Sequence, residues 1–213
     1  MKIDVLVSNS KHPVMEYLKR FSRTNHQNRD FRIVNDTAEL NGGSFLFLVS
    51  CSEIVPESIL QMYERVLVLH ASDLPAGRGW SPHIWAIVAG KSQITVSLLE
   101  ANKRVDTGDI WAKKTVNIPK SALYDEINHL IFKAEMELIE TALNQYSTII
   151  PTSQPFLALK TLRKRTEADS EIDPYRPLAE QFDLLRVCDP FRFPAFFKYR
   201  GKKFKLTLEE YRD

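Results

Sequence analysis

The stretch VLHASDLPAGRGWSP, residues 68–82, joins an apolar run directly to a histidine. Residues 66–69 are all aliphatic, which is typical of a strand covered on both faces. His70 follows at once, and the next twelve residues hold two prolines and two glycines. Proline restricts the backbone and glycine frees it, so this composition is typical of a tight loop. The stretch therefore predicts a buried strand that ends on His70 beside a stiff loop.

Strand-like and helix-like segments alternate around this stretch. Apolar runs predict strands at 3–7, 44–49, 65–69, 93–99 and 110–116, and a short one at 30–34. Helical spacing predicts helices at 13–21, 56–63, 82–89 and 121–144, with Ser121 as the cap of the last. This order predicts an α/β fold, a Rossmann-like and mostly parallel open sheet flanked by helices. Ligands of such sheets bind at the carboxyl ends of the strands, where His70 is expected.

The composition changes after Pro151. We expect a catalytic domain over residues 1–150 and a C-terminal linker and extension over 151–213. The extension is predicted to hold a helix at 180–187 and a β-hairpin at 198–206, and to serve in dimerisation or substrate binding. Four phenylalanines precede or begin the hairpin and offer apolar surface for a homodimer, or for packing back on the domain: Phe191, Phe193, Phe196 and Phe197.

The bulk properties narrow the class of protein. The net charge of +2 gives no reason to expect a nucleic-acid partner, and the basic run at 160–165 is either a solvated linker or a contact for phosphates. Two cysteines in 213 residues indicate reduced thiols. No apolar run is long enough to cross a membrane, and the N-terminus is predicted to be a strand rather than a signal peptide. We expect a cytoplasmic protein with no membrane partner.

Most common catalytic and metal-binding patterns are missing. The chain has five histidines, of which His12, His26 and His129 are interpreted as structural or surface residues. No two histidines are four residues apart and the cysteines are distant, so no metal site is predicted. The sequence also lacks a G-x-S-x-G nucleophile motif and a glycine-rich nucleotide fingerprint.

A second stretch repeats the pattern of the first. In LLEANKRVDTGD, residues 98–109, a strand-like run ends and a charged loop carries Asp106 before Thr107-Gly108. Aspartate and glycine also favour plain turns, so this stretch alone indicates only a turn. Two such strand ends at one edge of a sheet would bring Asp106 to His70. The carboxylate would then orient the imidazole and raise its basicity for acyl or proton transfer.

In order along the chain, these motifs resemble the folate-dependent formyltransferase family, which includes glycinamide ribonucleotide, methionyl-tRNA and sugar N-formyltransferases. The resemblance lies in His70 to Pro75, Arg78-Gly79, Ser81-Pro82, Trp85-Ala86-Ile87 and Asp106 to Asp109, and it covers roughly residues 44–145. Residues 165–173, 182–186 and 194–196 look like the tail of the sugar N-formyltransferases. We expect no long C-terminal domain of the kind with which methionyl-tRNA formyltransferases bind tRNA.

The resemblance implies roles for particular residues. It makes His70 and Asp106 the catalytic pair, with 10-formyltetrahydrofolate as co-substrate and no metal. The family's Asn-x-His motif has valine in place of asparagine here, at Val68. Loss of one oxyanion donor typically lowers turnover about 100- to 1000-fold. Either another donor replaces it, with Asn102, Ser72 and His83 as candidates, or catalysis is weak or lost.

The binding residues implied by the resemblance form two groups. The folate contacts are Cys51, Ser52, Ile54, Ile59, Leu67, Glu100, Asn102 and Val105, although Ile54, Ile59 and Leu67 suit core packing equally well. The substrate contacts are Arg78, Trp80 and His83, with Trp80 alternatively an anchor in a dimer interface.

The resemblance implies an enzyme that formylates the primary amine of a nucleotide-linked deoxyamino sugar, a step in surface glycan biosynthesis. Two alternatives remain open. One is a weak or inactive relative that binds folate or a nucleotide, because of Val68. The other is a hydrolase that releases formate from the same co-substrate.

Overall fold

The computed structural model describes residues 1–25 and 29–211, so His26 lies outside the described residues. The elements follow each other in the order β1 (Lys2–Leu6), α1 (Val14–Thr24), β2 (Asp30–Val34), η1 (Thr37–Glu39), β3 (Gly43–Leu48), α2 (Glu57–Leu60), β4 (Tyr63–His70), α3 (Pro82–Val88), β5 (Gln93–Glu100), β6 (Ile110–Asn117), α4 (Tyr124–Gln145), η2 (Glu167–Ser170), α5 (Leu178–Leu185), β7 (Ala195–Tyr199) and β8 (Lys202–Leu206).

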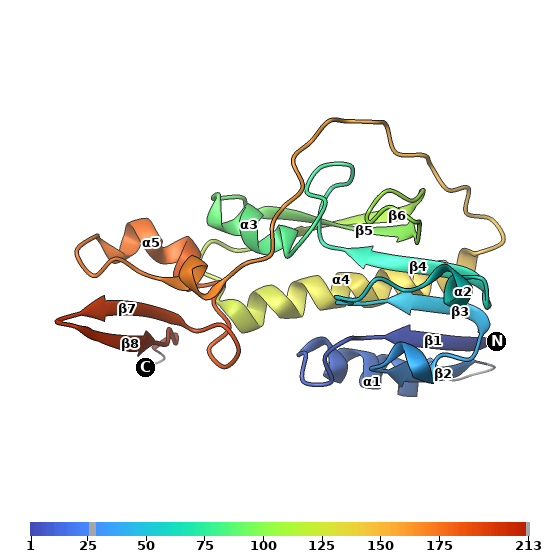
Figure 1. Cartoon of the computed structure of the whole chain (residues 1–213), viewed down its shortest axis with the longest axis horizontal. Helices are drawn as coiled ribbons and strands as arrows, with labels where there is room; N and C mark the ends of the chain where they lie inside the picture. The colour runs from blue at the N-terminus through green and yellow to red at the C-terminus, as the bar shows by residue number, and fades with distance from the viewer. Residues whose placement is uncertain (26–28, 212–213) are drawn as a thin grey trace.

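Six strands form one open sheet in the order β2-β1-β3-β4-β5-β6 (Figure 1). The pairs β1–β2, β1–β3 and β3–β4 are parallel, whereas β4–β5 and β5–β6 are antiparallel. This arrangement confirms the predicted Rossmann-like α/β fold, in which the parallel strands are joined through flanking helices or loops.

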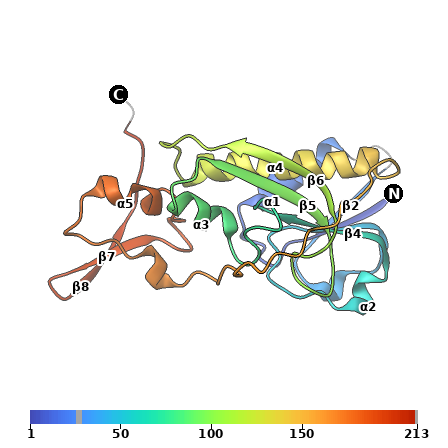
Figure 2. The ribbon, with the colours of Figure 1, turned by 90° about the horizontal axis from the view of Figure 1, so that it is seen from above.

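The two faces of the sheet are covered differently. The larger core packs α1 and α4 against one face, and a smaller apolar cluster under α2 covers the other (Figure 2). Strand β4 contributes to both, because successive side chains of a strand point to opposite faces. Leu67 and Leu69 belong to the larger core, and Val66 and Val68 pack against the smaller cluster. His70 shares the face of Val68 by the same alternation.

The direction of β5 corrects one step of the sequence argument. Because β5 is antiparallel to β4, with Leu67 opposite Glu100 and His70 opposite Ser97, the two strands do not end at the same edge. The loop 101–109 starts beside Val66, whose carbonyl accepts a hydrogen bond from the amide of Ala101 at 2.8 Å. The loop then folds back toward the end of β4, and this return carries Asp106 to His70.

Helix α4 begins later than predicted. Its N-cap is Leu123, and the carboxylate of Glu126 accepts a hydrogen bond from the Leu123 amide at 3.1 Å. Ser121 lies exposed in the preceding turn and does not cap the helix. A glutamate that reaches back to the amide at the helix start satisfies one of the free donors there, which makes a serine cap unnecessary.

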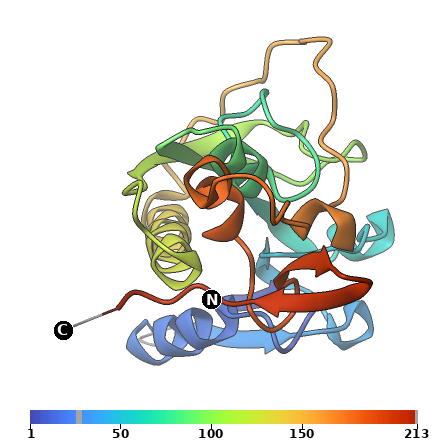
Figure 3. The ribbon, with the colours of Figure 1, turned by 90° about the vertical axis from the view of Figure 1, so that its left-hand side faces the viewer.

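The C-terminal extension packs on the body through buried polar anchors. The guanidinium of Arg186 is almost wholly buried and donates to the carbonyls of Pro119 and Ala122 at 3.0 and 3.2 Å. The hairpin β7–β8 is longer than predicted and lies at one end of the molecule (Figures 1 and 3). The phenylalanines divide: Phe196 is buried, whereas Phe191 is 89% exposed. The division into 1–150 and 151–213 stays a prediction.

None of the helices in the described ranges is long and apolar enough to span a membrane.

Candidate active site

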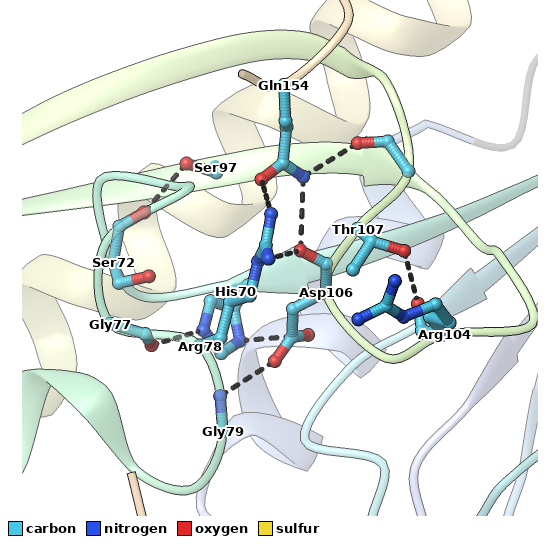
Figure 4. A network of polar contacts seen from close by, with 11 residues as sticks. His70, Ser72, Gly77, Arg78, Gly79, Ser97, Arg104, Asp106, Thr107 and Gln154 are labelled. Carbon is cyan, nitrogen blue, oxygen red and sulfur yellow. Dashed lines mark hydrogen bonds and ion pairs between the residues drawn. The ribbon is translucent and has the colours of Figure 1, made fainter. Parts of the chain in front are cut away.

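His70 and Asp106 meet at the end of β4 (Figure 4). Nδ1 of His70 lies 3.5 Å from Oδ1 of Asp106, and both residues are only 8% exposed. The imidazole reaches this place because β4 ends on it, and the carboxylate arrives from the loop between β5 and β6. The predicted contact between these two residues is therefore present, and both side chains are largely shielded from solvent.

The loop after β4 places a backbone acceptor against the imidazole. Nε2 of His70 lies 2.9 Å from the carbonyl oxygen of Gly77. A carbonyl oxygen can only accept, so Nε2 carries a proton in this arrangement. Gly77 has a φ of +75°, and a Cβ there would stand 2.8 Å from Cβ of Ser72. Glycine is needed at this position so that the carbonyl can turn toward the imidazole.

Asp106 adopts an uncommon backbone conformation that its neighbours stabilise. Its φ is +57°, in the left-handed region that costs a residue with a Cβ roughly 1–2 kcal/mol. Oδ2 accepts a hydrogen bond from the amide of Gly79 at 2.9 Å, and the carbonyl accepts one from Nε of Arg78 at 3.1 Å. Thus the loop after His70 holds Asp106 through both its side chain and its backbone.

The three predicted substrate residues lie in different surroundings. Arg78 donates through Nε to the carbonyl of Asp106 and through Nη2 to Oε1 of Gln154, each at 3.1 Å. Two of its three guanidinium nitrogens are therefore engaged within the site. Trp80 is 38% exposed, with the ammonium of Lys164 4.7 Å from its ring centroid. His83 has a buried Nδ1 with no partner, and burial, followed by the charge of His70, lowers its pKa to about 4.

Several predicted folate residues come from two adjacent loops. The loop that follows β3 carries Ile54, which is 82% exposed, and the loop that follows β5 carries Val105, which is 62% exposed. An ion pair of 3.1 Å between Lys103 and Glu57 joins the second loop to α2. Cys51 and Ile59 pack partly buried at the edge of the smaller cluster, and Ser52 and Asn102 are exposed. Exposed apolar side chains on neighbouring loops suit a flat apolar ligand.

Two predicted folate residues, Leu67 and Glu100, make contacts within the protein. Leu67 has no exposed surface and its side chain belongs to the larger core, so its place among the folate contacts stays a prediction. Its side chain points away from the face of His70 because it lies at an odd position of β4. Oε1 of Glu100 accepts a hydrogen bond from the indole of Trp111 at 3.0 Å. That bond uses part of the carboxylate to anchor β6.

Val68 lies on the face of His70 but has no polar group to offer. It packs partly buried against the smaller cluster. Among the three possible replacements for the missing asparagine, Ser72 and His83 each have a buried polar atom without a partner, Oγ and Nδ1. Asn102 is exposed on the loop 101–109. The unpartnered atoms of Ser72 and His83 leave two side chains near His70 able to donate to a ligand.

Gln154 was not predicted as a site residue from the sequence. Its side-chain amide donates to the carbonyls of Asp106 and Gly108, at 3.1 and 2.7 Å, and accepts from Arg78 (Figure 4). A single glutamine in a polar linker carries no local signal of this kind, because its partners lie 46 to 76 residues away. Within residues 1–25 and 29–211, no cluster of three or more histidine, cysteine or acidic side chains could hold a metal ion.

Comparison with known proteins identifies the family of the chain. The family model described as formyl transferase matches residues 2–143, and the chain belongs to this family. The methionyl-tRNA formyltransferase of Rickettsia typhi is 28% identical over 167 residues, which cover 78% of this chain and 55% of that protein. The chain thus spans little more than half the length of this curated relative.

Solved structures share the fold. A methionyl-tRNA formyltransferase from Clostridium thermocellum has a TM-score of 0.84 at 24% identity, over 100% of this chain and 94% of that one. HypX from Aquifex aeolicus in complex with tetrahydrofolic acid has a TM-score of 0.82 at 21% identity, over 98% of this chain and 37% of that one. A sugar N-formyltransferase from Shewanella has a TM-score of 0.72 at 18% identity, over 100% and 99%.

Proposed function

We propose that this chain is an N-formyltransferase that moves a formyl group from 10-formyltetrahydrofolate to the primary amine of a nucleotide-linked deoxyamino sugar. The observation that carries the proposal is the buried His70–Asp106 pair, seated in a chain of the formyl transferase family. The folate supplies the activated formyl group. The exposed Ile54 and Val105 support its place between the loops that follow β3 and β5.

His70 stabilises the negative charge that develops on the formyl oxygen during acyl transfer. A preplaced donor in a site with little water is worth more than the same donor in bulk water. The proton on Nε2 now points at the carbonyl of Gly77, so it must exchange that partner for the oxyanion. Positive φ values at Gly77 and Gly79 leave this loop the conformational freedom to do so.

Asp106 orients His70 and receives the proton of the acceptor amine. Its Oδ1 faces the imidazole, while Oδ2 is held by the Gly79 amide. The net reaction moves one proton from the attacking amine to the leaving nitrogen of the folate. Asp106 and His70 are the groups that hold it in transit, because no other pair of titratable side chains joins the catalytic loops within the described part of the chain.

The experiment begins with calorimetry, using a stable 10-formyltetrahydrofolate analogue with and without a panel of amino-sugar nucleotides. Transfer of labelled formyl is then measured with each sugar nucleotide and with methionyl-tRNA, and mass spectrometry separates an N-formyl product from free formate. A sugar nucleotide that tightens folate binding and becomes formylated supports the proposal. If only methionyl-tRNA is formylated, the acceptor is methionyl-tRNA and not a sugar nucleotide. If only formate is released, the acceptor is water. If the 10-formyltetrahydrofolate analogue does not bind, the proposal that the chain is a formyltransferase is refuted.

Two substitutions test the roles of the residues. His70→Ala should lower turnover at least 1000-fold, whereas His129→Ala, which removes an exposed histidine bonded to Tyr17, should not. Val68→Asn distinguishes a crippled site from a rebuilt one. A large gain in rate would mean that the missing donor limits catalysis, and a loss would mean that Ser72 or His83 already replaces it.

A further inference from the structure

Residues 152–165, which we call the strap, run across both catalytic loops (Figures 1 and 3). Thr152 and Ile110 exchange two backbone hydrogen bonds of 2.8 Å at the start of β6. Leu162 bonds the backbone on either side of Gly79, donating to Arg78 and accepting from Trp80 at 2.8 and 3.1 Å. The strap is therefore attached to the loop that holds Asp106 and to the loop that follows His70.

Gln154 is the point at which the strap meets the catalytic residues. Its Nε2 donates to the carbonyls of Asp106 and Gly108, and its Oε1 accepts from Nη2 of Arg78. Arg78 also bonds the carbonyl of Asp106. One side-chain amide thus links the carbonyls of Asp106 and Gly108 to the guanidinium of Arg78. Only a neutral amide fits, because its two sides face two acceptors and one donor.

We propose that Gln154 is a positioning residue for catalysis, and that its amide keeps the carboxylate of Asp106 against His70. This inference rests on the proposed function, since it concerns the same catalytic pair. Gln154 does not touch His70 or the carboxylate. It acts through the backbone of Asp106.

The backbone of Asp106 is held in a strained conformation. A residue with a Cβ at φ +57° is held there only when its surroundings compensate for the strain. Two donors, Nε of Arg78 and Nε2 of Gln154, share the carbonyl of Asp106, each at 3.1 Å. If the Gln154 amide is removed, the turn loses the two hydrogen bonds from Nε2 to the carbonyls of Asp106 and Gly108. The Asp106 carboxylate, already 3.5 Å from Nδ1 of His70, then has room to withdraw.

Gln154→Ala should lower kcat by roughly 10- to 100-fold, since a displacement of about 1 Å at a reacting group costs up to that much. The KM for the folate should change less than kcat, because Gln154 bonds the loop 101–109 at Asp106 and Gly108 and not at the predicted folate residues Asn102 and Val105. Gln154→Glu should be at least as damaging. Its carboxylate would face the carbonyls of Asp106 and Gly108 with no proton to donate.

Gln181→Ala is the matched control. The Gln181 amide also bridges backbone groups, donating to the carbonyls of Asp173 and Arg176 and accepting from the amide of Asp173. Both glutamines thus make three hydrogen bonds, and their removal should lower the free energy of unfolding similarly. Only Gln154→Ala should lower kcat. Equal kcat values for the two variants would overturn the proposal.

A double-mutant cycle separates positioning from a general loss of structure. In an Asp106→Asn background, Gln154→Ala should lower the residual kcat less than about twofold, because the group that it positions is already gone. A full second loss of 10-fold or more in that background would show that Gln154 acts elsewhere, and would overturn the proposal.

An NMR readout makes the test independent of turnover. The ¹⁵N and ¹Hε1 shifts of the His70 imidazole are recorded in the full chain without substrate, with Asp106→Asn defining the shift of the lost contact. Gln154→Ala should move the His70 signals in the same direction, and Gln181→Ala should leave them unchanged. Failure of formyl transfer in the wild type would refute the proposed function alone. Unmoved His70 signals in Gln154→Ala would refute the positioning role.

Discussion

Replacing Gly108 with alanine should damage both the fold and the catalytic pair. Gly108 lies two residues after Asp106, against the end of β5. A Cβ at this position would stand 1.9 Å from the carbonyl oxygen of Glu100 and 2.7 Å from its carbon. Carbon and oxygen atoms in contact need roughly 3.5 Å, so the two backbones must separate by about 1.5 Å. Both atoms belong to backbone, and no flexible side chain can move aside.

The expected loss of stability follows from the hydrogen bonds that this separation breaks. The amide of Glu100 donates to Asp109 at 2.9 Å, and Gln154 donates to the carbonyl of Gly108 at 2.7 Å. Each lost hydrogen bond costs about 1 kcal/mol, and overpacking typically costs 1–3 kcal/mol. Gly108→Ala should therefore lower the free energy of unfolding by about 3–5 kcal/mol. Displacement of Asp106 by a similar distance should lower kcat about 100-fold.

Urea unfolding followed by circular dichroism measures the first effect, and formyl transfer measured well below the unfolding midpoint measures the second. Gly90→Ala is the control. Gly90 has a φ of +83°, but a Cβ there meets no atom within 4 Å, so this variant should lose about 1 kcal/mol from backbone strain alone and keep its kcat. The reasoning would be refuted by a Gly108→Ala protein whose stability lies within 0.5 kcal/mol of the wild type.

Two further predictions concern buried charges away from the site. Burial raises the pKa of Glu135 on α4 to about 8, so the folded state binds a proton that the unfolded state releases near pH 4.5. The free energy of unfolding should then fall as the pH rises from about 5 to 8, and Glu135→Gln should abolish that fall; an unchanged slope in urea titrations across this range would contradict it. Asp4 is fully buried and bonded by both Nε and Nη2 of Arg32, at 2.8 and 2.9 Å. Arg32→Met should cost about 3–5 kcal/mol in urea unfolding, because it leaves a buried carboxylate without its counter-charge, and a loss below 1 kcal/mol would argue against this.

The sequence was sufficient for the elements of the sheet and for the contact between His70 and Asp106. Strands and helices leave a local mark, since the alternation or helical spacing of apolar side chains reports which face is buried. The predicted strands accordingly begin and end within two residues of β1 to β6. His70 directly follows such a run, and Asp106 lies in the charged loop after the next strand-like run.

The relation between those two residues was predicted for a reason that the structure corrects. Both were expected at one edge of parallel strands, but β5 runs antiparallel to β4, and only the returning loop 101–109 brings Asp106 back. Strand direction depends on which strands pair across the sheet. A short apolar run has the same pattern in either direction, so the sequence alone could not decide it.

The tertiary structure alone decided what surrounds the pair. Leu67 and Ile59 are both apolar residues of strand or helix, yet one lies in the core and the other at the edge of the site face. Gln154 sits in a polar linker and still holds the turn of Asp106, through partners 46 to 76 residues away. A hydrogen bond over such a separation leaves no periodic trace in the chain. It exists only once the sheet, the two catalytic loops and the strap have come together.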